Sequence, residues 1–119
     1  MNANHVTLAG FTTGPAELRY TEKGRAITTL TIAYNRKPMK EGEKGAVDFV
    51  EVKVWGKHAE AVAEACDAKG VPLIVTGPIR QDRWEKNGQK QSRLTVEAYL
   101  VARQILAERN PNPEPEGGE

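Results

Sequence analysis

The segment from Asp48 to Trp55 alternates strictly in side-chain character. Three valines fall on one side of it: Val50, Val52 and Val54. Phe49 and Trp55 fall on the other side, between charged residues, because successive side chains of a β-strand point to opposite faces. The pattern predicts a strand with one core face and one aromatic, charged face that is exposed for binding. Packing of the two rings beneath a loop or a neighbouring subunit is the structural alternative.

Further β-prone segments surround this strand. They lie at residues 5–13, 25–34, 71–79 with a polar continuation to 85, and 91–101, and a short extended piece lies at 17–21. Asn87-Gly88 is a strong signal for a two-residue hairpin turn, which predicts a hairpin with Trp84 near its tip. In the last strand, alternation predicts that Leu94, Val96, Ala98 and Leu100 are buried.

A single helix is predicted at residues 57–68, directly after the alternating strand. Ala59, Val62, Ala63 and Cys66 recur at helical spacing and form its apolar stripe. Cys66 falls on this stripe, so we expect a buried core residue rather than a reactive thiol.

Three strands, one helix and two further strands are the element order of a five-stranded Greek-key barrel. We therefore predict a mainly β fold, with extended hairpins and with the helix between the third and fourth strands. Residues 1–106 are expected to form one domain, since a chain of 119 residues is too short for two independent cores. Residues 107–119 are expected to be a disordered tail rich in proline and glutamate.

Composition narrows the possible functions. No apolar run approaches the roughly 20 residues that span a bilayer, so we expect a cytoplasmic protein without membrane contact. One cysteine and two histidines provide no zinc cluster, and no cofactor is expected. The nearest carboxylate pair, Asp48 and Glu51, is three residues apart on a strand and points to opposite faces, so no catalytic residues and no enzyme activity are expected.

The charge is uneven along the chain. Of 17 basic and 16 acidic residues, the last thirteen positions hold one arginine and four glutamates. The preceding body keeps 16 basic and 12 acidic residues, a net charge of +4, which mildly favours a polyanionic partner.

Several stretches between Asn4 and Ile105 resemble the bacterial single-stranded DNA-binding protein family. In order along the chain they are residues 6–10, 14–20, Gly24 with 31–36, 48–52, 55–60, 69–70 and 77–85. The resemblance implies an oligonucleotide-binding (OB) fold. It also implies sequence-independent binding and protection of single-stranded DNA in replication, recombination and repair.

The resemblance assigns base stacking to Phe49, Trp55 and Trp84, the same rings that alternation and the hairpin place on the exposed face. Phosphate contacts need cations along the path of the strand. The candidates are Arg19, Arg36, Lys37, Lys53, Lys57, Arg80, Arg83 and Lys90. RNA remains an alternative ligand, because stacking and phosphate contacts serve both nucleic acids.

Partners follow from the same resemblance. It implies a homotetramer, with a dimer as the alternative, that is associated with the nucleoid. The family's acidic tip, which recruits replication proteins, is absent from this sequence, so recruitment through such a tip is not expected.

Two departures from the family pattern suggest a weaker binder. The loop after Arg36 lacks an aromatic residue that relatives often carry, and Asp82 stands among positions that tend to be basic. These departures keep a second hypothesis open, a replication-restart (primosomal) OB-fold adaptor that binds DNA weakly.

Overall fold

The two longest strands form the centre of the fold. The computed structural model describes residues 1–38 and 40–105. Within it, β3 (Ala26–Arg36) pairs antiparallel with β4 (Ala46–Trp55) along nearly the whole of both strands. Leu30, Ile32, Val52 and Val54 of these strands are buried, which confirms the predicted core faces.

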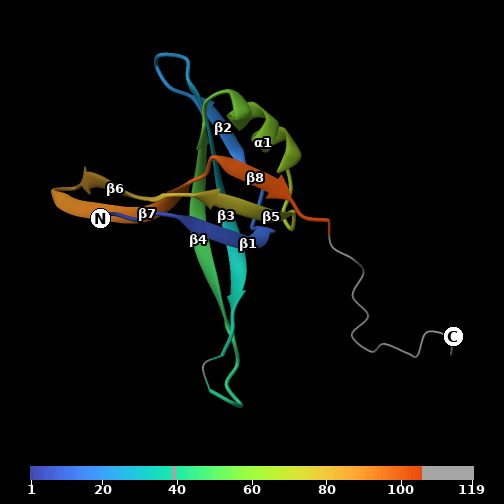
Figure 1. The fold of residues 1–119 in the computed structure, drawn as a ribbon. Coiled ribbons are helices and arrows are strands. Elements are labelled where there is room, and N and C mark those ends of the chain that lie inside the picture. The colour runs from blue at the N-terminus through green and yellow to red at the C-terminus, as the bar shows by residue number, and fades with distance from the viewer. Residues whose placement is uncertain (39, 106–119) are drawn as a thin grey trace, which may run out of the picture.

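The remaining strands curl this sheet into a partly open barrel (Figure 1). β1 (Val6–Thr12) pairs with β5 (Pro72–Gly77) and with the middle of β3. β7 (Gln89–Glu97) runs parallel to β4, and β8 (Leu100–Arg103) pairs with β5. The core lies between them and includes Leu73, Val75 and Val96. The predicted mainly β architecture is confirmed. The predicted tail, 107–119, lies outside the described residues.

One predicted strand is divided in the structure. The segment predicted at residues 91–101 turns at Ala98 and Tyr99, so that its first part pairs with β4 and its second part with β5. Leu94 and Leu100 were predicted to be buried, and this was wrong, because they are 62% and 50% exposed. Leu94 lies on a hairpin that extends beyond the barrel, and Leu100 follows the turn, where the alternation restarts.

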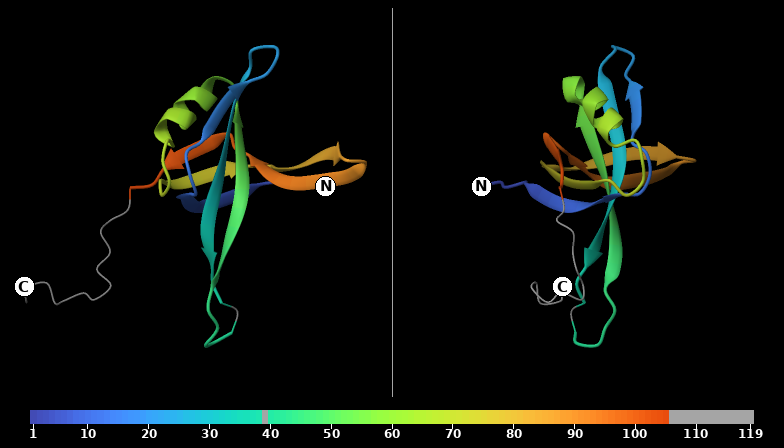
Figure 2. Two further views of the ribbon diagram at one scale, coloured as in Figure 1. Left: turned by 180° about the vertical axis from the view of Figure 1, so that it is seen from behind. Right: turned by 90° about the vertical axis from the view of Figure 1, so that its right-hand side faces the viewer.

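Two hairpins leave the barrel in different directions (Figures 1 and 2). One is formed by β3 and β4, and the other by β6 (Ile79–Lys86) and β7. Asn87 and Gly88 both have positive φ angles, 52° and 78°, as the predicted two-residue turn requires. The second hairpin is held at its base by Asn4, whose side chain makes two hydrogen bonds of 2.7 Å with the backbone of Ile79.

The helix packs over one end of the barrel beside β2 (Glu17–Tyr20). It is shorter than predicted: a 3₁₀ turn, η1 (Gly56–His58), precedes α1 (Ala59–Ala65). Beyond Ala65 the free carbonyls accept hydrogen bonds from other segments, that of Cys66 from the Ala16 N–H and that of Ala68 from the Thr12 hydroxyl. No helix in the described part of the chain is long and apolar enough to cross a membrane.

Cys66 is 1% exposed, as the helical stripe predicted. Burial raises the pKa of its thiol; Arg103 acts in the opposite direction and Asp67 adds to the rise. Because the thiolate is the nucleophile, we expect native protein at pH 8 to react with iodoacetamide at least about tenfold more slowly than urea-unfolded protein. Mass spectrometry over a time course measures both rates, and equal rates would contradict this burial.

Candidate nucleic-acid interface

The exposed face of β4 carries the first half of the candidate site. Phe49, Glu51, Lys53 and Trp55 share this face by alternation, opposite the valines that face the core. Phe49 is 65% exposed, so its ring is available to a ligand. Trp55 is partly buried. The strand thus presents two aromatic rings separated by an acid and a base.

The hairpin of β6 and β7 supplies the second half. Parallel pairing places Thr95 beside Glu51 and Glu97 beside Lys53, so the outer side of the hairpin continues the face of β4. Trp84, 39% exposed, lies farther out on β6. We call the combined surface the aromatic face; it consists of Phe49, Glu51, Lys53, Trp55, Arg80, Asp82, Trp84, Arg93 and Glu97.

Two adjoining hollows mark the aromatic face. One, of about 410 Å³, is lined by Trp84, and the other, of about 240 Å³, by Trp55. Both are also lined by Lys53, Arg80 and Asp82, so the two indole rings stand on either side of a shared charged centre. A flexible strand laid along this surface passes from one ring to the other across these charges.

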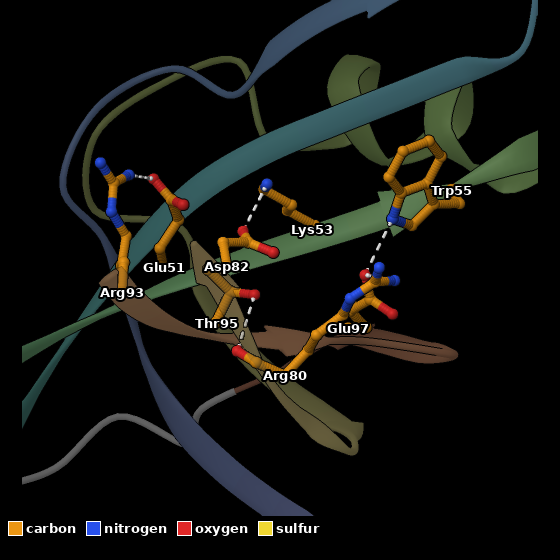
Figure 3. Close-up of polar contacts among 8 residues, drawn as sticks. All are labelled: Glu51, Lys53, Trp55, Arg80, Asp82, Arg93, Thr95 and Glu97. Carbon is orange, nitrogen blue, oxygen red and sulfur yellow. Dashed lines mark hydrogen bonds and ion pairs between the residues drawn. The ribbon is translucent and has the colours of Figure 1, made fainter. Parts of the chain in front are cut away.

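The acidic and basic side chains of the aromatic face form three ion pairs (Figure 3). Lys53 Nζ lies 2.8 Å from Asp82 Oδ2, and Arg93 Nη1 lies 2.7 Å from Glu51 Oε2. Arg80 Nη1 lies 3.3 Å from Glu97 Oε2. The pairs join β4 to β6, β4 to β7 and β6 to β7, so they tie the hairpin to the barrel.

Both indole rings are also held by cations. The guanidinium carbon of Arg25 lies 4.8 Å from the centre of the Trp55 ring, and that of Arg93 lies 5.1 Å from the Trp84 ring. Trp55 Nε1 donates a hydrogen bond of 3.3 Å to Glu97. Such contacts fix the orientation of the rings before a ligand arrives.

Comparison with known proteins gives a family match over most of the chain. Residues 3–104 match the Single-strand binding protein family. The chain belongs to that family. The resemblance read from the sequence is thereby confirmed, and single-strand binding is the property by which the family is described.

Individual relatives support the assignment. A single-stranded DNA-binding protein of Treponema pallidum is 36% identical over 102 residues, which cover 84% of this chain and 57% of the relative. One of Thermus thermophilus is 37% identical over 84% of this chain and 37% of the relative. A solved deletion mutant of the single-stranded DNA binding protein from Thermus aquaticus has a TM-score of 0.73 and 28% identity, covering 87% of this chain and 51% of that one. The chain thus spans roughly half of these longer proteins.

The family assignment leaves the roles of single residues to be argued from position. Of the eight cations predicted to contact phosphate, four lie at the tryptophans. Lys53 and Arg80 line both hollows, Arg83 lines the Trp84 hollow, and Arg83 and Lys90 line a third hollow at the hairpin tip beside Trp84.

The other four predicted cations lie apart from the tryptophans. Arg36 and Lys37 are exposed at the far end of β3, on the hairpin that carries Phe49, and Arg36 pairs with Asp48 at 3.4 Å. Arg19 on β2 and Lys57 in η1 are exposed and line neither tryptophan hollow. A strand bound between Trp55 and Trp84 therefore has to extend beyond both hollows to reach them.

Arg25 and Arg93 were not identified as residues of the site from the sequence alone. Arg93 could have been found: the turn at Asn87-Gly88 pairs Trp84 with Gln91, which puts Arg93 on the same face, diagonal to the ring. Arg25 could not, since its contact with Trp55 depends on how β3 registers against β4.

Metal chemistry has no visible basis in residues 1–38 and 40–105, where no group of three or more potential ligand side chains is found. Asp48 and Glu51, the nearest carboxylate pair in the sequence, are each bound to an arginine. Absence of enzyme activity stays a prediction.

Proposed function

We propose that the aromatic face binds single-stranded nucleic acid, DNA in the first place, without sequence preference. The observation that carries this is the exposure of Phe49 and Trp84 on one continuous face with Trp55 and several cations. Every base has a π-face, so aromatic stacking tolerates any sequence. The protein's role is protection of unpaired strands during replication, recombination and repair, without catalysis.

Phosphates are contacted by the cations around the rings. Arg80, Arg83 and Lys90 line the hollows beside Trp84, and Arg36 and Lys37 lie on the hairpin of Phe49. These side chains are exposed, so a phosphate can reach them without displacing core residues. Such contacts release counterions and make the affinity depend on salt.

The direct test is a titration of the protein's tryptophan fluorescence with a long thymidine oligonucleotide at 50 mM and 300 mM salt. We expect strong quenching, because Trp55 and Trp84 stack on bases, and weaker binding at the higher salt. An RNA of uridines of equal length, run in parallel, measures the preference between nucleic acids. Unchanged fluorescence together with no salt-sensitive binding would refute the proposal.

Self-association, as a homotetramer or a dimer, is part of the same proposal. Residues 6–9 of β1 pair with β5 on one side, and in the described chain β3 pairs with β1 only at Phe11 and Thr12. A strand edge left open in this way is a template for pairing with another copy. Light scattering with and without an oligonucleotide of defined length measures the mass and the stoichiometry together.

A second candidate function is a replication-restart adaptor with weak DNA binding. The pairing of Lys53, Arg80 and Arg93 with carboxylates favours it, because paired cations attract phosphate less. The titration above separates the two candidates: a dissociation constant far weaker than micromolar at 50 mM salt supports the adaptor.

A further inference from the structure

The three ion pairs of the aromatic face differ in how exposed their basic side chains are. The side chains of Arg80 and Arg93 are 63% and 51% exposed, whereas that of Lys53 is 17% exposed. A guanidinium has five N–H donors, so an arginine that holds a carboxylate keeps donors for a phosphate. Lys53 is a compact ammonium enclosed by the walls of both hollows.

Asp82 is the group that holds Lys53. Its carboxylate is 27% exposed and lies 2.8 Å from the ammonium, and salt screens a half-buried pair of this kind less than an exposed one. The pair stands between Trp55 and Trp84, where a bound strand has to cross. Lys53 is therefore the cation best placed to meet a phosphate and the one least free to do so.

We infer, on the basis of the proposed function, that Asp82 holds Lys53 in an ion pair and so keeps it from contacting phosphate. Asp82 thereby sets the affinity of the aromatic face for single-stranded DNA and the dependence of that affinity on salt. The face then binds mainly through its rings and through its two exposed arginines, Arg80 and Arg93. Asp82 is a positioning residue in this scheme: it contacts no nucleic acid and acts through the lysine.

The test compares salt slopes, the change in the logarithm of the binding constant with the logarithm of salt concentration. Asp82→Asn frees Lys53 for one additional phosphate, so the slope for a thymidine oligonucleotide should steepen by about 0.7. If the affinities converge near 1 M salt, that slope corresponds to about eightfold tighter binding at 50 mM. An unchanged slope overturns the inference.

Lys53→Met provides the decisive comparison. In the wild-type background it should leave the slope unchanged, because a lysine held in this ion pair contacts no phosphate. In the Asp82→Asn background it should make the slope shallower by about 0.7. The double variant should then bind within about twofold of wild type. If Lys53→Met made the slope shallower by about 0.7 in the wild-type background, Lys53 would already contact phosphate, and the inference would be overturned.

Glu17→Gln is the matched control for net charge. Glu17 is exposed on β2 and forms no ion pair within the described residues, so its removal adds the same charge without freeing a cation. Its slope should equal that of wild type, and a steepening like that of Asp82→Asn would contradict the inference. Wild-type protein that fails to bind refutes the proposed function; binding with unchanged variants refutes only the role of Asp82.

Discussion

The double substitution of Phe49 and Trp84 by alanine is expected to weaken binding of a thymidine oligonucleotide by about 30-fold to 20,000-fold. Each base stack contributes about 1–3 kcal/mol, a range measured on proteins of this class rather than on this chain, and 1.4 kcal/mol corresponds to a factor of ten. Both rings are substantially exposed, so the barrel should keep its stability. Fluorescence anisotropy of a labelled oligonucleotide measures the loss at fixed salt.

The salt slope of this double variant separates stacking from charge. Neither ring carries a charge, so the slope should stay at the wild-type value while the affinity falls. Tyr99→Ala is the matched control, since Tyr99 is as exposed as Phe49, at 67%, but lies where β7 turns into β8, outside the aromatic face. Equal losses in the control and in the double variant would show that the aromatic face is not the binding surface.

Local patterns in the sequence were sufficient to predict much of this site. Alternation along β4 separates Val52 and Val54 from Phe49 and Trp55, because each side chain's direction follows from its neighbour's. The turn at Asn87-Gly88 fixes the register of its own hairpin and so places Trp84.

The charge pairing of the site could not be predicted in this way. Lys53 and Asp82 are 29 residues apart, and Glu51 and Arg93 are 42 apart. Each pair exists because β7 runs parallel to β4, and a parallel register depends on the closure of the whole barrel rather than on any local turn. Lys53 was predicted to contact phosphate because alternation places it on the exposed face. Its ion pair with Asp82 could not be predicted in the same way.

The same closure explains why alternation failed at Leu94. The alternating pattern continues past the end of the barrel into the free hairpin, where neither face of the strand has a core to pack against. Burial therefore depends on where the barrel ends, and the sequence of a single strand does not contain that information.

Gly77→Ala is expected to destabilise the protein by about 3 kcal/mol, since overpacking a closely packed site forces the backbone apart. A Cβ added at Gly77 would overlap the carbonyl oxygen of Glu97 and lie 2.8 Å from the Cα of Ala98. These are backbone atoms, so they cannot move aside as a flexible side chain can. The hydrogen bonds that close the barrel flank this contact: Tyr99 N–H to the Thr76 carbonyl and Glu97 N–H to the Pro78 carbonyl, both 2.9 Å.

Urea unfolding followed by circular dichroism measures this loss as a lower midpoint. Gly14→Ala is the matched control, because a Cβ there meets no atom within 4 Å, and it should change the free energy of unfolding by less than about 0.5 kcal/mol. Since β7 carries Arg93 and Glu97 of the aromatic face, Gly77→Ala should also weaken oligonucleotide binding at temperatures where the protein is still folded. If Gly77→Ala were as stable as Gly14→Ala, the close approach of β5 to the end of β7 would not be what closes this barrel.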